Sequence, residues 1–299
     1  MPPSASSVHL AAVIVTFSPE IERLVSLLSA LGDEYPVFIF DNGSDNAADV
    51  TSVAAEFSAT LIASEANVGL AAALNRLEAG LPPAIKGFVA FDQDSEPGDG
   101  YIRRLEALWS EARRQSPATA ALGGWVIDLP DHVHLGFFRL QGLRAVELPM
   151  KNGVVQPDWL IISGTLYDRE AFRKTGIFDD QLFVDNVDLE WSYRAQSKGY
   201  RLLGTDRVTM LHQVGNRSIH LPGMGWHVKI HSPDRSMIMT RSRVLSYRKN
   251  TIPAIWKWHD GIRFILKTVI MIVFADQRIP RVKAIFRGLK QGITMPIER

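Results

Sequence analysis

The sequence predicts an α/β protein: a Rossmann-like, mostly parallel sheet flanked by helices, followed by a helical C-terminal tail. The first observation is that short apolar runs alternate along the body with segments of helical periodicity. The second is the apolar run 88–91, which ends abruptly at turn-forming residues, as a buried parallel strand does. The third is charge: residues 241–299 hold thirteen Lys or Arg and three Asp or Glu, whereas the body before them is acidic.

The body is expected to alternate strands and helices with right-handed crossovers. The expected elements are, in chain order, strand 8–17, helix 19–31, strand 37–40, strand 61–64, helix 70–79, strand 87–91 and a helix near 100–115. Ser18 is expected to cap the first helix, with Pro19 at its first position. A further helix is expected to begin near residue 187.

Composition excludes several classes of protein. The 299 residues with 46% hydrophobic content suit one large or two small domains. A net charge of +1 predicts no nucleic-acid partner, and the lack of cysteine excludes disulfides and Cys-ligated zinc. The first residues lack a signal-peptide pattern, and no uncharged apolar run of about 18 residues predicts a membrane span.

Two carboxylates follow the strand 87–91. Ligands of open α/β sheets bind beyond the carboxyl ends of strands, where Asp92 and Asp94 lie. Residues i and i+2 of an extended chain point the same way, so the two carboxylates converge and repel unless a cation lies between them. Oxygen ligands of this kind suit Mg²⁺ or Mn²⁺, which usually bring phosphate. The alternative is an ordinary Asp-rich turn.

Other strand ends carry polar groups as well. Asp41 and Asn42 end the strand 37–40, and Asn67 with Gly69 follows the next strand. The alternative interpretation is an Asn-Gly turn. Neither a G-x-G-x-x-G sequence after the first strand nor a G-x-x-x-x-G-K-[ST] sequence is present, which argues against a dinucleotide oxidoreductase and a P-loop NTPase.

Together these motifs resemble inverting GT-A glycosyltransferases of the family 2 type. Asp41-Asn-Gly-Ser44, Asn67-Val-Gly69 and Asp92-Gln-Asp94 resemble the nucleotide-sugar half of that family. The stretches 163–172, 176–179 and 183–194 resemble its acceptor half. The Asp-x-x-Asp-x-Glu-Trp form after Val184, and His212-Gln-Val-Gly215, are most similar to bacterial rhamnosyltransferases that use dTDP-L-rhamnose. The resemblance covers roughly residues 8–220.

The resemblance implies three groups of site residues. The residues that would bind Mg²⁺ or Mn²⁺ are Asp92 and Asp94. His212 is a further candidate ligand, and the alternative is that it has only a structural role. Many relatives have a second carboxylate, often assigned as the base, at the position of Asn186, which is an amide here. The implied general base is therefore Asp185, with Asp188 as the second candidate. The positions that correspond to nucleotide-sugar contacts are Thr16, Phe17, Asp41, Asn42, Asn67, Gly69, Asp92, Gln93 and Gly164.

The implied activity is metal-dependent, inverting transfer of a sugar, L-rhamnose from dTDP-L-rhamnose, to a saccharide or lipid-linked saccharide in bacterial surface polysaccharide synthesis. The implied domain is 1–240, with a nucleotide-sugar half 8–98 and an acceptor half 99–240. A UDP- or GDP-sugar is the alternative donor. Two other classes stay open: a haloacid-dehalogenase-like phosphatase, which also carries D-x-D-x-[ST] but on its first strand, and a non-enzymatic membrane-associated binding protein.

The tail 241–299 is expected to act at the cytoplasmic face of the membrane. Residues 256–275 combine an apolar run with Trp and spaced cations, and Arg263 with Lys267 shares one helix face. A basic amphipathic segment of this kind is typical of an interfacial helix. The alternatives are a helix packed on the acidic body or a homodimer interface. The pairs His132/His134 and His227/His231 are interpreted as structural.

Overall fold

The computed structural model describes residues 9–128, 133–142, 144–150, 153–212, 218–221, 226–229, 232–274 and 277–297. The first part of the chain builds β1 (Leu10–Thr16), α1 (Ile21–Leu31), β2 (Val37–Asp41), α2 (Ala47–Glu56), β3 (Thr60–Ala63), α3 (Leu70–Gly80), β4 (Gly87–Asp92), β5 (Ser95–Pro97) and α4 (Tyr101–Gln115). The middle builds β6 (Thr119–Asp128), β7 (Val133–Leu135), β8 (Phe138–Gln141), β9 (Arg144–Glu147), β10 (Thr165–Asp168), α5 (Arg169–Thr175), the 3₁₀ turn η1 (Asp180–Leu182), α6 (Val187–Ser197) and β11 (Arg201–His212). The last part builds β12 (Ser218–Leu221), β13 (Trp226–Lys229), α7 (Pro233–Arg248), α8 (Ala254–Phe274) and α9 (Arg278–Thr294).

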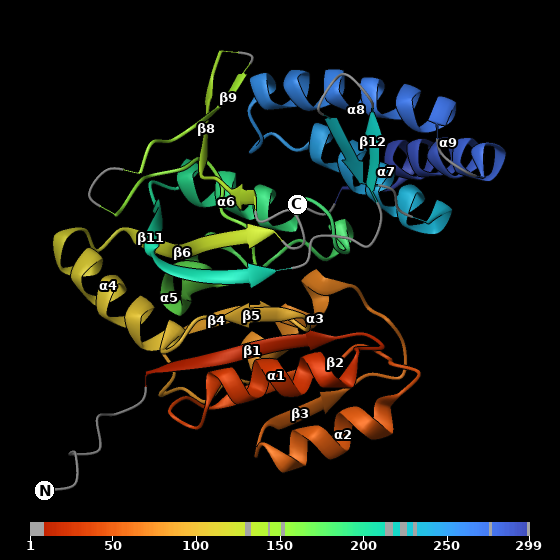
Figure 1. Ribbon diagram of the computed structural model, residues 1–299. Helices are drawn as coiled ribbons and strands as arrows, with labels where there is room; N and C mark the ends of the chain where they lie inside the picture. Colours follow the sequence, from red (N-terminus) through yellow and green to blue (C-terminus); the bar gives the residue numbers. More distant parts are fainter. Residues whose placement is uncertain are drawn as a thin grey trace, which may run out of the picture.

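The main sheet has the strand order β3-β2-β1-β4-β10-β6-β11-β5, with β7 paired to β6. Strands β3, β2, β1 and β4 run parallel, as do β6 and β11, whereas β10 and β5 run antiparallel to their neighbours. The prediction of a mostly parallel sheet flanked by helices is confirmed. Figure 1 shows the arrows of β1 and β6 pointing to the same end of the molecule, where the C-terminal helices gather.

Alternation along the strands produces two apolar cores, one on each face of the sheet. On β1, Ala11 and Val13 join the core under α3, α5 and α6, whereas Leu10, Ala12 and Ile14 join the core under α1, α2 and α4. Each of these five residues is at most 1% exposed. Helices therefore cover both faces of the sheet, and the ends of its strands are the positions where polar residues can be exposed.

The start of α1 corrects the sequence-based expectation. Ser18 does not cap the helix and Pro19 is not its first residue, because α1 begins at Ile21 with Glu20 at the cap position. Ser18 instead adopts a positive φ of 43°, and its hydroxyl accepts a hydrogen bond from Asp45 N at 3.2 Å. The hydroxyl thus ties two loops at the strand ends together. Helix α2, which completes the crossover to β3, fits the expected alternation of strands and helices, although no residue range was predicted for it.

Helices α7, α8 and α9 form one packed unit at the C-terminus (Figure 1). Helix α7 runs through residues 240 and 241, so the structure has no break at the predicted boundary of the tail. Two glycines of α9 let its backbone touch α7: a Cβ at Gly288 would lie 2.4 Å from the Met237 carbonyl oxygen, and one at Gly292 would lie 2.6 Å from Val244 Cβ. Among the described residues, no helix combines the length and apolar character that crossing a membrane requires.

Two of the four histidines interpreted as structural, His132 and His231, lie outside the described residues, and the side chain of His227 does too. Trp125 Nε1 donates a hydrogen bond to His134 Nδ1 across the β6–β7 pair. His134 is therefore occupied within the sheet edge.

A buried arginine fastens the antiparallel strand β10 to the turn that leads into β4. Arg169 Nε donates to Glu78 Oε1 at 2.7 Å, and its two Nη groups donate to four backbone carbonyls between residues 78 and 85. Arg173 contacts the same Glu78 carboxylate at 2.7 Å, but its side chain is 54% exposed whereas that of Arg169 is 7% exposed.

We expect Arg169→Met to lower the free energy of unfolding by about 3–5 kcal/mol, because it breaks a buried ion pair and leaves backbone carbonyls without donors. The matched control Arg173→Met, at an exposed partner of the same carboxylate, should cost about 0–1 kcal/mol. Urea unfolding of the three proteins measures both values. Equal losses for the two variants would contradict the assigned role of Arg169.

Candidate active site

Three parallel strands end side by side in polar residues. The register pairs Thr16 of β1 with Asp41 of β2, and Val15 of β1 with Asp92 of β4. Because parallel strands present their carboxyl ends at one edge, these polar ends meet at a single place. The polar ends of β1, β2 and β4 are therefore neighbours at one edge of the sheet.

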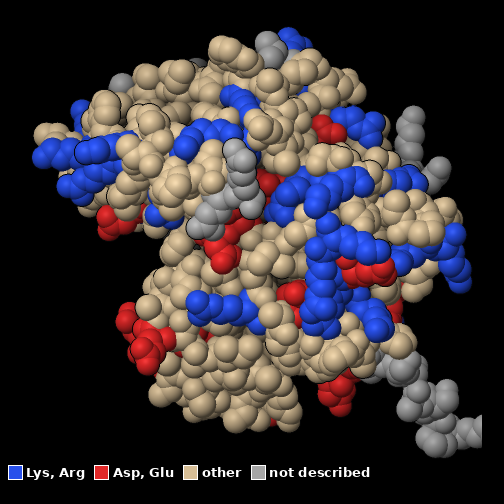
Figure 2. Space-filling view, turned by 180° about the vertical axis from the view of Figure 1, so that it is seen from behind, with Lys and Arg blue, Asp and Glu red and all other residues tan. Residues whose placement is uncertain are grey.

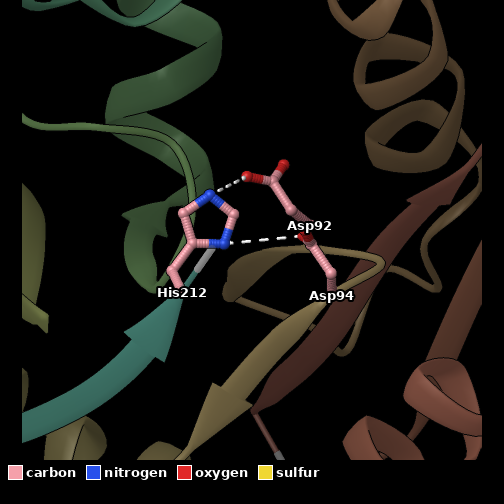
Figure 3. Close-up of side chains that lie close together, drawn as sticks. All are labelled: Asp92, Asp94 and His212. Carbon is pink, nitrogen blue, oxygen red and sulfur yellow. Dashed lines mark ion pairs between the residues drawn. The ribbon is translucent and has the colours of Figure 1, made fainter. Parts of the chain in front are cut away.

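A fourth polar group reaches this edge from much later in the chain. After Asp92 the chain turns back as β5, which pairs antiparallel with β11 so that Ser95 lies opposite His212. The imidazole lies between the two carboxylates, with Nε2 3.4 Å from Asp92 Oδ2 and Nδ1 3.5 Å from Asp94 Oδ1 (Figure 3). All three side chains can direct a ligand atom to one point, since these atoms lie within 4.8 Å of one another.

This set of side chains fits a divalent cation. The separations of His212 from the two carboxylates exceed those of ordinary hydrogen bonds, and His212 Nδ1 is buried without a hydrogen-bond partner among the described residues. Carboxylate oxygens suit Mg²⁺ and Mn²⁺, and imidazole is acceptable to transition metals such as Mn²⁺. His212 thus lies where the candidate third ligand was expected.

The electrostatics of the cluster call for positive charge. Burial raises the pKa of Asp94, His212 offsets part of that rise, and the neighbouring Asp92 carboxylate adds to it. The Asp92 backbone is fixed from below, because its N–H faces the hydroxyls of Ser95 at 3.1 Å and Ser163 at 3.2 Å. These two hydroxyls also bond each other at 2.8 Å. The two carboxylates are thus held in place on either side of the His212 imidazole.

A cavity of about 280 Å³ opens beside the cluster. Its lining includes Asp92 and the expected nucleotide-sugar residues Phe17, Asn42, Asn67, Gly69 and Gln93. The Gln93 side chain braces the wall, since Phe17 N donates to Gln93 Oε1 at 2.7 Å and Gln93 Nε2 donates to the Phe17 carbonyl at 3.3 Å. The Phe17 ring itself is 49% exposed and free to stack on a flat ligand.

Two predicted contact residues lie below this cavity rather than in its lining. Thr16 and Asp41 are 0% and 1% exposed. Thr16 Oγ1 donates to Asp41 Oδ1 at 3.0 Å, and the Ser44 hydroxyl donates to the same oxygen. The pair therefore supports the strand ends from beneath in this structure.

The loop motifs at 42 and 67 are joined to each other. Asn42 Nδ2 donates to Asn67 Oδ1 at 3.0 Å, and Asn42 Oδ1 accepts from Val68 N at 2.8 Å. Gly69 has a φ of 88°, and a Cβ there would lie 2.6 Å from the Phe183 ring. The close approach that glycine permits thus brings the segment 183–188 against the loop that follows β3.

Gly164 occupies a position of a different kind. Its φ is 75°, and a Cβ would lie 2.5 Å from the Tyr101 hydroxyl, which donates to the Gly164 carbonyl at 2.7 Å. Gly164 N in turn donates to the Ala90 carbonyl of β4 at 2.7 Å. This glycine packs α4 against the central strand and does not line the cavity.

The two candidate bases, Asp185 and Asp188, lie on either side of the start of α6; they follow the lining residues Phe183 and Val184 but do not line the cavity themselves. Burial raises the pKa of Asp185, and Arg235, Arg243 and more weakly Lys267 act against that rise. Burial raises the pKa of Asp188 to about 6, with Asp185 and Asp92 adding to the effect. Asp188 Oδ1 accepts from Leu189 N at 2.8 Å, whereas Asp185 Oδ2 is buried with no hydrogen-bond partner in the described part of the chain.

The amide between them has a local reason. Asn186 adopts the left-handed conformation with φ 64° at the cap of α6, which asparagine tolerates better than most residues. Its Nδ2 donates to the Ser246 hydroxyl of α7 at 3.2 Å, a bond that a carboxylate could not donate. Asn186 therefore connects α6 with α7 and leaves the neighbouring carboxylates for other tasks.

Sequence reasoning missed three participants. Ser163 and Ser95 hold the Asp92 backbone, and Arg235 of α7 lines the cavity and pairs with Asp185 at 3.1 Å. Ser163 stood in a motif that resembles the acceptor half, which is a signal that could have pointed to it. Nothing in the sequence around Arg235 distinguishes it from the nearby Arg241 and Arg243.

The protein has a larger cavity elsewhere, but the charged side chains that line it are already paired. This cavity, of about 770 Å³, is lined by Arg194, Lys249 and Arg248. These cations are already engaged: Arg194 pairs with Glu190 at 2.9 Å, Lys249 pairs with Asp179, and Arg248 donates to the Gly292 carbonyl at 2.6 Å. The smaller cavity at the strand ends is thus the better candidate site.

Comparison with known proteins gives relatives along nearly the whole chain. No model of a known protein family matches it. The chain is 27% identical to the dTDP-rhamnosyl transferase RfbF of Shigella flexneri over 301 residues, which cover 95% of each chain. It is also 27% identical to the N-acetylglucosaminyl-diphospho-decaprenol L-rhamnosyltransferase of Mycobacterium tuberculosis over 236 residues, or 68% of this chain and 75% of that one.

Solved structures share the fold at low sequence identity. The structure of GalNAc-T7 with UDP, GalNAc and Mn²⁺ has a TM-score of 0.58 and 13% identity over 91% of this chain, which spans 59% of that protein's length. Residues 1–349 of S. aureus TarS in complex with UDP give a TM-score of 0.51 and 13% identity over 90% of this chain and 73% of that one. Both neighbours are GT-A glycosyltransferases, so the predicted GT-A fold is confirmed.

We expect wild-type protein to bind Mn²⁺ and Asp92→Asn or Asp94→Asn to weaken that binding by about 10- to 100-fold, since each removes a charged oxygen from the cluster. Electron paramagnetic resonance of free Mn²⁺ during titration measures this directly. Asp99→Asn, an exposed aspartate of the following turn, is the matched control. Unchanged Mn²⁺ affinity in both site variants would show that the cluster does not hold metal.

Proposed function

We propose that this protein, a glycosyltransferase of the GT-A fold, transfers L-rhamnose from dTDP-L-rhamnose to a saccharide acceptor by a metal-dependent, inverting displacement. The observation that carries the proposal is the meeting of Asp92, Asp94 and His212 at the carboxyl edge of the sheet, beside a cavity lined by Phe17 and Asn42. The names of the relatives in Shigella and Mycobacterium support rhamnose as the sugar.

The roles of the residues follow from the bonds that must change. An acceptor hydroxyl attacks the anomeric carbon, the bond from that carbon to the diphosphate oxygen breaks, and the hydroxyl proton passes to a carboxylate of the protein. Attack on the face opposite the leaving group inverts the anomeric centre. A divalent ion held by Asp92, Asp94 and His212 would supply positive charge to the leaving diphosphate. Phe17 and Asn42 would orient the nucleoside, and Gln93 would keep the wall in place.

Asp185 is the base that we propose. Its Oδ2 is buried without a hydrogen-bond partner in the described structure, so it can accept a proton without first breaking another bond. Its Oδ1 is held by Arg235, which favours the ionised form that a base needs. Asp188 is the second candidate, because its pKa of about 6 also lies near the operating range of a base.

We propose further that the acceptor is lipid-linked and that α8 and α9 rest on the cytoplasmic face of the membrane. Of thirteen exposed large apolar side chains in the described residues, ten lie on these two helices. Along α8 they recur every three or four residues and so share one face: Ile255, Trp258, Ile262, Ile265, Leu266, Val269 and Ile272. On α9 they are Ile279, Phe286 and Ile293.

Charge favours an anionic lipid surface over a second copy of the chain. The exposed apolar residues of α9 alternate with exposed Lys283, Arg287 and Lys290. Figure 2 shows one group of Lys and Arg at the upper left, on the side of the C-terminal helices in that view, and a second group on the right. Two such faces would repel each other, whereas anionic lipid adds about 1 kcal/mol per basic residue near the surface. The decaprenol-linked acceptor named for the mycobacterial relative also supports a membrane location.

A panel of nucleotide sugars tests the main proposal. With Mn²⁺ present, we expect donor hydrolysis or transfer with dTDP-L-rhamnose at a rate at least about 10-fold above that with UDP- or GDP-sugars, as a difference of about 1.4 kcal/mol in transition-state binding would give. EDTA should abolish it. If turnover is highest with a UDP- or GDP-sugar, the assignment of dTDP-L-rhamnose as the donor is wrong. Thermal stabilisation by a phosphate mimic, without turnover of any donor, would favour a phosphatase.

A second prediction concerns the base. Asp185→Asn should lower kcat by about 100-fold or more while metal-dependent binding of dTDP stays unchanged, because the base acts on the acceptor. Steady-state kinetics and calorimetric titration measure the two quantities. If Asp185→Asn turns over normally and Asp188→Asn does not, the base is Asp188.

A third prediction concerns the membrane. Ile265→Glu should reduce flotation of the full-length protein with vesicles that contain anionic lipid, since it places a charge in the proposed apolar face. Ile177→Glu is the matched control, at an isoleucine of the body that is 50% exposed against 65% for Ile265, and it should float like wild type. No flotation of wild type at low salt, with a dimer that Ile265→Glu dissociates, would assign this face to a second copy instead.

A further inference from the structure

Helix α7 supplies a cation to the site. Arg235 lies in its first turn, after the Ser232 cap whose hydroxyl accepts from Arg235 N at 3.2 Å. It is the only Lys or Arg among the described residues that line the cavity beside Asp92. Its Nη2 donates to Asp185 Oδ1 at 3.1 Å. A residue outside every motif of the nucleotide-sugar and acceptor halves is thus in direct contact with the proposed base.

The ion pair between Arg235 and Asp185 is half satisfied on each side. Asp185 uses Oδ1 and leaves Oδ2 buried without a hydrogen-bond partner, and Arg235 Nε is likewise buried without one in the described part of the chain. A pair that served stability alone would be expected to use both carboxylate oxygens, since an unpaired buried oxygen costs free energy. The single contact holds Oδ1 and leaves Oδ2 without a hydrogen-bond partner, so that Oδ2 can take up a proton.

The position of α7 is itself fixed on both sides of Asp185. The Ser242 hydroxyl donates to the Leu182 carbonyl at 2.5 Å, and the Ser246 hydroxyl accepts from Asn186 at 3.2 Å. Helix α9 then holds α7 from outside through its glycine contacts, and Arg281 donates to the Ser236 hydroxyl at 3.2 Å. The guanidinium therefore approaches Asp185 from a rigid support.

Other charges face Asp185 from every neighbouring element. Asp188 on α6 opposes its ionisation, whereas Arg243 on α7 and Lys267 on α8 favour it. Arg243 is occupied by Asp260, whose Oδ2 lies 2.6 Å from Arg243 Nε. Lys267 lies in a desolvated position that lowers its own pKa. Arg235 is thus the cation in direct contact with Asp185, whereas Arg243 and Lys267 stabilise the ionised carboxylate more weakly.

We propose that Arg235 is a positioning residue of the active site: it orients Asp185 through Oδ1 and keeps it ionised, so that the C-terminal helices are part of the catalytic machinery and not only an attachment. This inference rests on the proposed role of Asp185 as the base. It goes beyond that role because it assigns to α7 a share in the chemistry. Its experiment is therefore built on a readout that does not require turnover.

The direct test is a carbon-13 NMR titration of aspartate carboxylates in the metal-free full-length protein, with Asp185→Asn to identify the Asp185 signal. Because Arg235 stabilises the ionised form, Arg235→Met should raise the pKa of Asp185 by about one unit, as loss of an adjacent opposite charge does. Arg235→Lys restores the charge and should return most of the shift. Arg287→Met, the same change at an exposed residue of α9, should leave the pKa where it is in wild type.

Turnover gives the second readout. In Arg235→Met the acid limb of the pH profile of kcat should move to higher pH by the same interval, and kcat at neutral pH should fall about 10-fold as part of the base's contribution is lost. An unchanged carboxylate titration in Arg235→Met overturns the proposal, as does a fall in kcat without movement of the acid limb. Lack of turnover in wild type with every donor would refute the proposed function, while the NMR titration would still decide whether Arg235 controls Asp185.

Discussion

The antiparallel pairing of β5 with β11 is the contact on which the site depends. It places His212 opposite Ser95, one residue after Asp94, and so joins the turn after β4 to the end of the last long strand. Without it Asp92 and Asp94 would be a carboxylate pair at the end of one strand, with only mutual repulsion between them. With it they become two sides of a set of three ligand atoms within 4.8 Å of one another. The register of the strands thus brings the three side chains together at the edge of the sheet.

The second half of the site is assembled by close approach. Gly69 lets the loop after β3 touch Phe183, and the segment that follows Phe183 carries both candidate bases. Helix α7 closes this arrangement from the far side through Asn186 and Arg235. The result is a sequence of contacts that runs from the strand ends to the C-terminal helices without leaving the region of the cavity. The two hydrogen bonds to α7, from Asn186 to Ser246 at 3.2 Å and from Arg235 to Asp185 at 3.1 Å, both join side chains.

The sequence was most informative where local pattern and chemistry coincide. The apolar run 88–91 predicted β4, and the i, i+2 spacing of Asp92 and Asp94 predicted that they point together, because both follow from the two-residue period of a strand. Ser18 was misassigned for the opposite reason. Its hydroxyl has two possible partners, the first turn of a helix or a neighbouring loop, and only the tertiary structure brings Asp45 N within 3.2 Å.

Arg235 shows what a sequence cannot supply. It lies in a stretch where arginine is frequent, and its role depends on the placement of α7 against residues 182–186, which the tertiary fold alone determines. The burial of Thr16 and Asp41 is similar: their types suggested contacts with a ligand, but the register of β1 with β2 turns them toward each other. Residue type and spacing identify which residues belong to a site. Tertiary packing decides which of them line the cavity and which lie beneath it.

The glycine contacts between α7 and α9 have a consequence for how a shortened protein behaves. Removing α9 would uncover the backbone of α7 near Met237 and leave the Ser236 hydroxyl without the Arg281 donor. The helix that carries Arg235 would then be free to shift, and the loop at 182–186 with it. Truncation would therefore remove two things at once: the exposed apolar face proposed to contact the membrane, and the support that holds Arg235 against Asp185, the proposed base.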